Sequence, residues 1–123
     1  MIRTLLSLFF GLLLALGAVA HILKPEFYAP MVPAPIPLGL ANVVATIAEG
    51  GIAILIFVPA TRRWGLIGFT ALMVAFLPIH VWDLVREDNV FGSVEAAWVR
   101  LLIQFVLIGL GVWLARGPSA SKG

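Results

Sequence analysis

One carboxylate lies in the middle of a long apolar segment. Glu49 comes about ten residues into the segment 39–58, which places it about 15 Å along a helix that rises about 1.5 Å per residue. Asn42 and Thr46 precede it by seven and three residues and share its helical face. An unpaired charge at this depth in hydrocarbon costs about 2.5–3.5 kcal/mol, so such residues usually have a function. Glu49 is therefore a candidate acid or base, and the alternative is a protonated carboxyl group that only joins two helices.

Polar residues also interrupt the other apolar segments. His21 ends the segment 4–23. His80 and Asp83 are three residues apart on the segment 64–85, and Arg100 and Gln104 are four apart on the segment 97–115. Each pair shares a helical face, and all of these residues fall in the same half of a four-helix bundle. Because lipid penalises exposed polarity, we expect them to meet inside the protein, in a polar pocket with Glu49 at its floor.

The residue types suggest roles within this pocket. A carboxylate and an imidazole are common proton-transfer groups, so Glu49 and His80 are candidate catalytic residues. The candidate ligand-binding residues are His21, Asn42, Thr46, Asp83, Arg100 and Gln104. Structural alternatives stay open for each residue type. Amides and hydroxyls join helices, long charged side chains reach the interface, and a histidine can cap a helix or pack beside a kink such as the one expected at Pro78.

The composition identifies the environment of these segments. The chain has 123 residues, of which 62% are hydrophobic and 11% charged, and its mean hydropathy is +1.10. Each apolar segment is near the roughly 20 residues that a helix needs to cross a bilayer. The sequence predicts an all-α fold, a four-transmembrane-helix bundle that forms one domain over residues 1–123. The segment 4–23 also has features of a signal peptide, with Arg3 before it and Ala18-Val19-Ala20 at its end, but we interpret it as a span.

Basic residues predict the orientation of the spans. Arg3, Arg62, Arg63, Arg116 and Lys122 fall on one side of a four-span arrangement, and Lys24, Arg86 and Arg100 fall on the other. The excess favours both termini in the cytoplasm. Tryptophan, which prefers the membrane interface, lies at or near the predicted ends of the spans, at positions 64, 82, 98 and 113.

The loop between the first two spans is rich in proline. Residues 24–38 contain five of the eight prolines, so we expect an extended or polyproline backbone there. The loop also carries Phe27, Tyr28 and Met31. It either covers the mouth of the bundle on the outer side or is a stiff interfacial connector.

Several chemistries are excluded or disfavoured. With no cysteine the chain forms no disulfide and ligates no iron–sulfur cluster through thiolates. Two histidines do not complete a four-ligand zinc site, so we predict no metal. The net charge of +2 is scattered, which argues against nucleic acid. A haem held between His21 and His80 is a weaker alternative.

Short motifs along the chain resemble those of the DoxX-like family of small membrane proteins. The matching stretches, in order, are 21–28 (HILKPEFY), 48–51 (AEGG), 59–63 (PATRR), 76–79 (FLPI) and 100–104 (RLLIQ), where Leu102 replaces a proline of the family pattern. The resemblance covers roughly residues 17–113. It implies four helices in a bacterial inner membrane, and for some members an association with thiosulfate–quinone oxidation or with redox complexes.

The resemblance and the residues together give three functional hypotheses. The first is a redox-associated subunit that binds a quinone-like molecule or a lipid headgroup, with electrons supplied by a membrane or soluble partner protein. The second is a structural or assembly subunit, in contact with a partner or with a second copy of the chain. The third is a membrane-embedded acid–base enzyme that acts on a lipophilic substrate.

Overall fold

The computed structural model describes residues 1–117, and these residues form an all-α fold. The elements are α1 (Ile2–Leu23), η1 (Pro25–Met31), α2 (Leu38–Phe57), η2 (Pro59–Thr61), α3 (Arg62–Ala75), α4 (Leu77–Val85) and α5 (Val94–Arg116). No β-strand occurs within this range, so the predicted fold class is confirmed. Lys122, which we counted among the cations of one side, lies outside the described residues.

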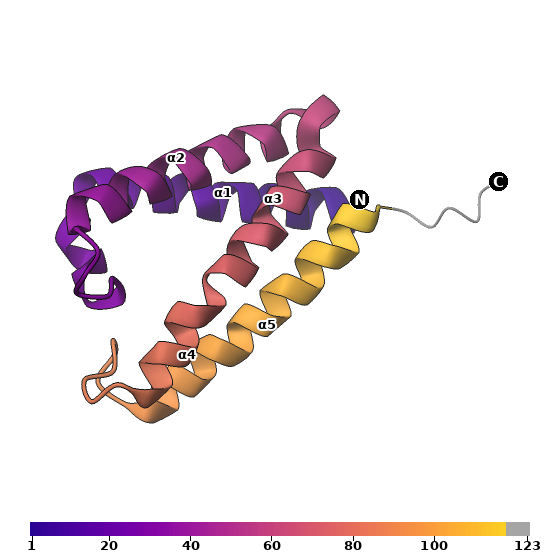
Figure 1. Ribbon diagram of the computed structural model, residues 1–123. Helices are drawn as coiled ribbons and strands as arrows, with labels where there is room; N and C mark the ends of the chain where they lie inside the picture. Colours follow the sequence, from indigo (N-terminus) through magenta and orange to yellow (C-terminus); the bar gives the residue numbers. More distant parts are fainter. Residues whose placement is uncertain (118–123) are drawn as a thin grey trace.

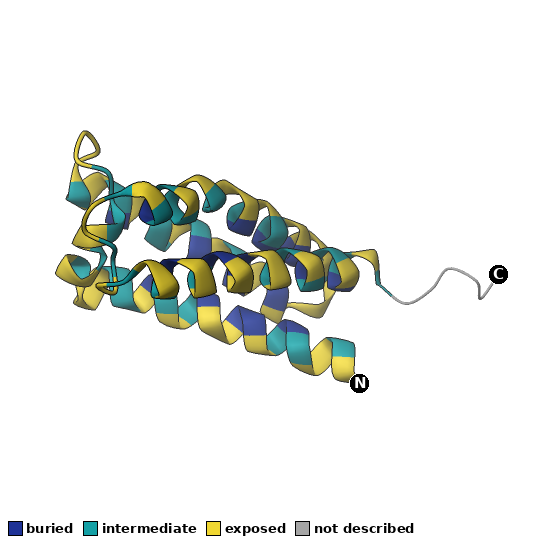
Figure 2. Cartoon of the chain, turned by 90° about the horizontal axis from the view of Figure 1, so that it is seen from below, coloured by how far each residue is buried: buried dark blue, intermediate teal, exposed yellow. Residues whose placement is uncertain are grey.

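Four stretches are long and apolar enough to cross a membrane: α1, α2, the run Pro59–Val85 and α5. The predicted boundaries lie within three residues of the ends of α1, α2, α3, α4 and α5. Exposed positions follow the outward faces of these helices (Figure 2). Many of them carry large apolar side chains, such as Ile47, which is 70% exposed, and Val106, which is 58% exposed. Such a surface needs lipid around it, and the chain is a multi-pass membrane protein.

The third span is broken into two helices, as its proline predicts. Phe76 separates α3 from α4, and Pro78 lies in the first turn of α4. Proline has no N–H group, so it is tolerated in a first turn but would remove a hydrogen bond from a continuous helix. The break leaves backbone carbonyls that need other donors.

The proline-rich loop differs from our expectation of an extended backbone. Its first half, η1, is a 3-10 helix with Pro25 at its start. Val32 and Pro37 have extended backbone angles, and between them the N–H of Ile36 closes a turn on the carbonyl of Pro33. The prediction is therefore wrong for residues 25–31. The fixed φ of proline suits the first turn of a helix as well as an extended strand, and Pro25 needs no N–H partner there.

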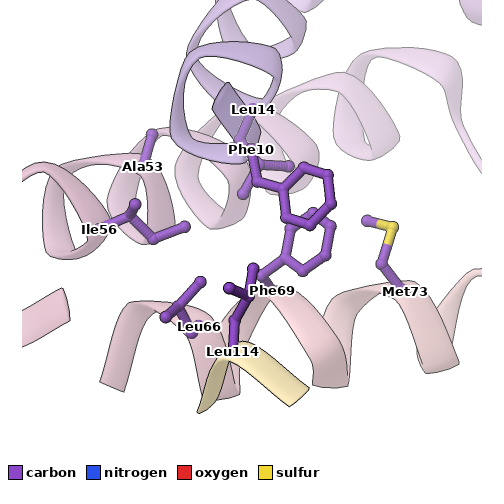
Figure 3. Close-up of a cluster of buried hydrophobic side chains, with 8 residues drawn as sticks. All are labelled: Phe10, Leu14, Ala53, Ile56, Leu66, Phe69, Met73 and Leu114. Atoms are coloured by element: carbon purple, nitrogen blue, oxygen red, sulfur yellow. The ribbon is translucent and has the colours of Figure 1, made fainter. Parts of the chain in front are cut away.

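The apolar core fills one half of the bundle. Helix α1 packs against α2, α2 against α3, and α3 and α4 against α5. The rings of Phe10 and Phe69 stack with 4.6 Å between their centroids. Gly65 allows α3 to lie close to the end of α2, because a Cβ there would be 2.6 Å from the backbone nitrogen of Ile56. Figure 3 shows the buried cluster of Phe10, Leu14, Ala53, Ile56, Leu66, Phe69, Met73 and Leu114.

The other half of the bundle is more open. In Figure 1 the pair α1–α2 and the pair α4–α5 separate toward the end that carries η1 and the loop between α4 and α5. A hydrogen bond crosses this end, from the Arg86 guanidinium to the carbonyl of Pro30. The candidate polar residues lie in this half, so the fold separates an apolar half from a half that contains a cavity.

Candidate functional site

A cavity of about 260 Å³ opens between the two helix pairs. We call it the polar cavity. Its polar lining consists of His21, Tyr28, Asn42, Glu49, His80 and Arg100. Its apolar lining consists of Met31, Val32, Ala41, Ala45, Phe76 and Ile79. An apolar cavity with a few polar groups is the usual form of a site for a small molecule. Glu49, the residue expected at the floor, is 8% exposed and faces the interior, away from lipid.

His21 joins α1 to two side chains of α2. Its Nδ1 lies 2.7 Å from Oδ1 of Asn42, and its Nε2 lies 2.8 Å from Oε2 of Glu49. The side chains of His21 and Glu49 are each only 10% exposed. Sequence spacing placed His21 in the same half of the bundle as the other polar residues, and the structure places it in direct contact with Glu49.

The hydrogen bonds of Asn42 determine which nitrogen of His21 carries a proton. The amide nitrogen of Asn42 donates to the carbonyl of Pro25 at 3.3 Å, and a carbonyl oxygen can only accept. The amide oxygen of Asn42 therefore faces His21, and Nδ1 of His21 is a donor. The bond between Nε2 and Glu49 then holds one proton. That proton lies on the imidazole, which gives an ion pair, or on the carboxyl group, which gives a neutral pair.

Tyr28 covers this pair from η1. The rings of His21 and Tyr28 stack at 3.7 Å between centroids. Burial and, to a smaller extent, the nearby carboxylate of Glu49 raise the pKa of the Tyr28 phenol above its ordinary value of 10. Sequence reasoning treated Tyr28 as part of an apolar loop and missed this contact. The sequence signal for this contact was the position of Tyr28, seven residues after His21, with Pro25 between them to make the turn compact.

Gly17 is a second residue that sequence reasoning missed. A Cβ at this position would collide with Oε1 of Glu49. The absence of a side chain on α1 therefore leaves room for the carboxyl group of α2. Gly17 precedes His21 by four residues, so both lie on the face of α1 that meets Glu49.

Asp83 and Arg100 form a separate ion pair between α4 and α5. Nη1 of Arg100 donates to Oδ2 of Asp83 at 2.6 Å, and the carboxylate of Asp83 is 1% exposed at its side chain. Its Oδ1 accepts from the backbone of Val90 at 2.8 Å, and the carbonyl of Asp83 accepts from the side chain of Asn89. Asp83 thus holds the loop after α4. It does not line the polar cavity, whereas Arg100 does.

Two further predicted ligand-binding residues also lie away from the cavity lining. Nε2 of Gln104 donates to the carbonyl of Met73 at 2.7 Å, beside the break between α3 and α4. Thr46 donates to the carbonyl of Ala18 at 3.5 Å, between α1 and α2. Both contacts are of the kind that joins helices in a membrane, which was the structural alternative for these residues.

His80 lines the cavity and has one unused nitrogen. Its Nδ1 is buried and has no hydrogen-bond partner among the described residues. A buried polar atom without a partner costs about 1–3 kcal/mol, so a ligand with a hydroxyl group or carbonyl oxygen would be stabilised there. The structure brings His80 into the same lining as His21 and Glu49, with no direct hydrogen bond between His80 and either of these two residues.

The residues do not fit a haem or a metal centre. Both ring nitrogens of His21 are engaged, by Asn42 and Glu49, so His21 has no nitrogen available for iron without loss of one of these bonds. Within residues 1–117 no group of three or more His, Cys, Asp or Glu side chains could hold a metal ion.

The comparisons with known proteins give a family. Residues 10–115 match the model of the family described as "Domain of unknown function (DUF8561)". The chain belongs to this family. No curated protein and no solved structure matches it. The matched range of the DUF8561 family contains every candidate residue named above, from Gly17 to Gln104, so the polar cavity belongs to the domain that defines the family.

Proposed function

We propose that the chain binds a lipophilic molecule with a quinone-like headgroup in the polar cavity and exchanges a proton with it. The observation that carries the proposal is the His21–Glu49 pair, bonded at 2.8 Å on the wall of a largely apolar cavity. A shared proton at a buried carboxyl–imidazole contact is available to a ligand oxygen without an unpaired charge in lipid.

The rest of the lining suits the same ligand. Met31, Val32, Phe76 and Ile79 offer an apolar surface to an aromatic ring or the first part of an isoprenoid tail. The imidazole of His80 and the guanidinium of Arg100 line the cavity and offer polar groups to the oxygen atoms of a headgroup.

The likeness of the motifs to the DoxX-like family supports a redox-associated role in a bacterial inner membrane. Reduction of a quinone to a quinol takes up two electrons and two protons. The electrons would come from a redox partner protein, and the His21–Glu49 pair would pass protons to the quinone oxygens. The excess of arginine at one end of the bundle supports an orientation with both termini in the cytoplasm.

A binding experiment tests the proposal. Decylubiquinone, a short-tailed quinone, is titrated into the purified full chain, and tryptophan fluorescence reports binding. Ala45→Leu fills the cavity without changing its polar groups, and we expect it to raise the Kd at least about tenfold. Ala75→Leu is the matched control, because Ala75 is exposed on α3 and lies outside the cavity lining. Equal Kd values for the two variants would overturn the assignment of the site.

Glu49→Gln separates binding from proton exchange. It keeps the shape of the side chain and removes its titration, so we expect decylubiquinone still to bind but the Kd to lose its dependence on pH. Mass spectrometry of an organic extract then identifies the natural ligand. A profile that keeps the same pH dependence in Glu49→Gln would exclude this residue as the proton donor.

A structural role for the polar residues is the second candidate function. The contacts of two of these residues favour it. Asp83 and Gln104 bond to the backbone of other segments and lie outside the cavity lining. If Ala45→Leu and Glu49→Gln both leave ligand content, assembly and growth unchanged, the polar residues serve packing alone, and the chain is a structural subunit.

A further inference from the structure

A second hollow lies on the lipid-facing side of the protein, at the opposite end from the polar cavity. It is a groove of about 420 Å³ between α3 and α5, lined by Arg63, Ile67, Thr70, Ala71, Val112, Ala115 and Arg116. On α3 the lining positions 63, 67, 70 and 71 follow one helical face. The groove therefore runs about 12 Å along the helix, from the arginine of the first turn to Ala71.

The end of the bundle where this groove begins is rich in arginine. Arg3, Arg62, Arg63 and Arg116 lie there, and we call this the basic end. The segments 1–25, 50–82 and 96–123 contain no Asp or Glu. All six carboxylate side chains of the chain lie in the remaining segments, at positions 26, 49, 83, 87, 88 and 95. Among residues 1–117, no acidic side chain forms an ion pair with an arginine of the basic end.

Two of these arginines are engaged by the backbone and two are not. Arg3 donates to the carbonyl of Trp113 at 2.7 Å, and Arg62 donates to the carbonyl of Ile56 at 2.8 Å. Arg63 and Arg116 form no hydrogen bond or ion pair with any residue between 1 and 117. These two exposed arginines are the ones that line the groove.

We propose that this groove binds an anionic phospholipid, with its phosphate held between Arg63 and Arg116 and an acyl chain along the groove. Guanidinium groups bind phosphate oxygens through charge-assisted hydrogen bonds. Basic pockets between transmembrane helices are suited to acidic headgroups. Ala71 and Ala115 leave the space, and Ile67 and Val112 supply an apolar wall for hydrocarbon. This site is independent of the quinone-like ligand proposed for the polar cavity.

Charge complementarity distinguishes this occupant from an ordinary bilayer lipid. A zwitterionic lipid places its own cation beside the arginines, whereas phosphatidylglycerol brings a net negative charge. The site combines a charged mouth with an apolar groove, so it needs both parts of the lipid. Inorganic phosphate would satisfy only the mouth.

Native mass spectrometry of the full chain in detergent tests the proposal. Phosphatidylglycerol and phosphatidylcholine with the same acyl chains are added at equal concentration, and the fraction of protein with one bound lipid is measured. We expect phosphatidylglycerol to be retained at least about tenfold better. Arg63→Gln and Arg116→Gln should each weaken its retention about fivefold. Lys24→Gln removes one exposed charge at the other end of the bundle and should have no such effect.

A second pair of variants tests the apolar part of the groove. Ala71→Leu fills it while all charges remain, and it should reduce retention of phosphatidylglycerol, whereas Ala75→Leu should not. Circular dichroism checks that each variant keeps its helices. Equal retention of the two lipids, an equal loss in Lys24→Gln, or an unchanged Ala71→Leu variant would each overturn the proposal. Quinone binding by Ala71→Leu should stay unchanged, which keeps the two sites experimentally separate.

Discussion

Gly17 of α1 lies against the Glu49 carboxyl group of α2, so closely that a methyl group at position 17 would collide with Oε1. Two positions 32 residues apart in the sequence thus depend on each other. The contact keeps Glu49 inside the protein and within reach of His21. The contact also gives a reason for glycine at position 17 of this transmembrane helix, where helix propensity alone would favour alanine.

This dependence predicts that the effect of Gly17→Ala changes sign with the residue at position 49. In the wild-type protein the substitution should lower the free energy of unfolding by about 1 kcal/mol, because the carboxyl group must move. In a Glu49→Ala background it should raise the free energy of unfolding by up to about 1 kcal/mol, because alanine favours the helix. Unfolding in sodium dodecyl sulfate, followed by circular dichroism, measures both. The same sign in both backgrounds would contradict the contact.

The ion pair of Asp83 and Arg100 predicts a large loss of stability from one substitution. Asp83→Ala leaves the guanidinium and the Val90 N–H without their acceptor, and we expect a loss of about 3 kcal/mol in unfolding free energy. Asp88→Ala is the control. Asp88 is exposed in the neighbouring loop, and a surface change of this kind is typically within about 0.5 kcal/mol. Similar losses in both variants would mean that Asp83 does not act through this pair.

The bond between Gln104 and the Met73 carbonyl predicts a purely structural effect. Gln104→Leu should lower the free energy of unfolding by about 1–2 kcal/mol, because a buried carbonyl at the helix break loses its donor. Thr46→Val, which removes a longer bond of 3.5 Å, should cost less. The Kd for decylubiquinone should be unchanged in Gln104→Leu. An increase in this Kd would instead show that Gln104 contributes to ligand binding.

The ionisation of the Tyr28 phenol should be easy to follow as the pH rises, because Tyr28 is the one tyrosine in the sequence. Burial and the carboxylate of Glu49 both disfavour the phenolate, so phenolate absorbance should appear only above pH 10. Stability should then fall as the pH rises through the folded-state pKa of Tyr28, since the folded protein holds this proton more tightly than the unfolded chain. Glu49→Gln should shift the pKa of Tyr28 downward. Glu26→Gln, an exposed carboxylate of the same loop, should leave it in place.

Local properties of the sequence were sufficient for the spans and the break at Phe76. Length and hydropathy define a transmembrane helix without any knowledge of its partners, and a missing N–H group at Pro78 disturbs its own helix. The burial of Glu49 also followed from the sequence, because the cost of a carboxyl group in hydrocarbon does not depend on which helix covers it. The proline-rich loop was harder, since the φ of proline is compatible with both an extended backbone and a helical first turn.

The pairing of the polar residues depended on the tertiary structure. Spacing placed His80, Asp83, Arg100 and Gln104 in the same half of the bundle as Glu49, but it could not give the rotation of each helix about its axis. The structure joins Asp83 to Arg100, turns Gln104 toward Met73 and leaves the unpaired nitrogen of His80 beside the cavity. A rotation of a few tens of degrees would exchange these partners at little change in hydropathy.

The sequence by itself determined that this chain crosses a membrane as helices and hides its polar groups, because those results follow from the free energy of transfer of each segment into lipid. The tertiary structure decided which polar groups share a proton, which hold loops, and which two arginines meet at a groove. Those outcomes depend on contacts between segments far apart in the chain, where a single glycine such as Gly17 determines whether a carboxyl group fits.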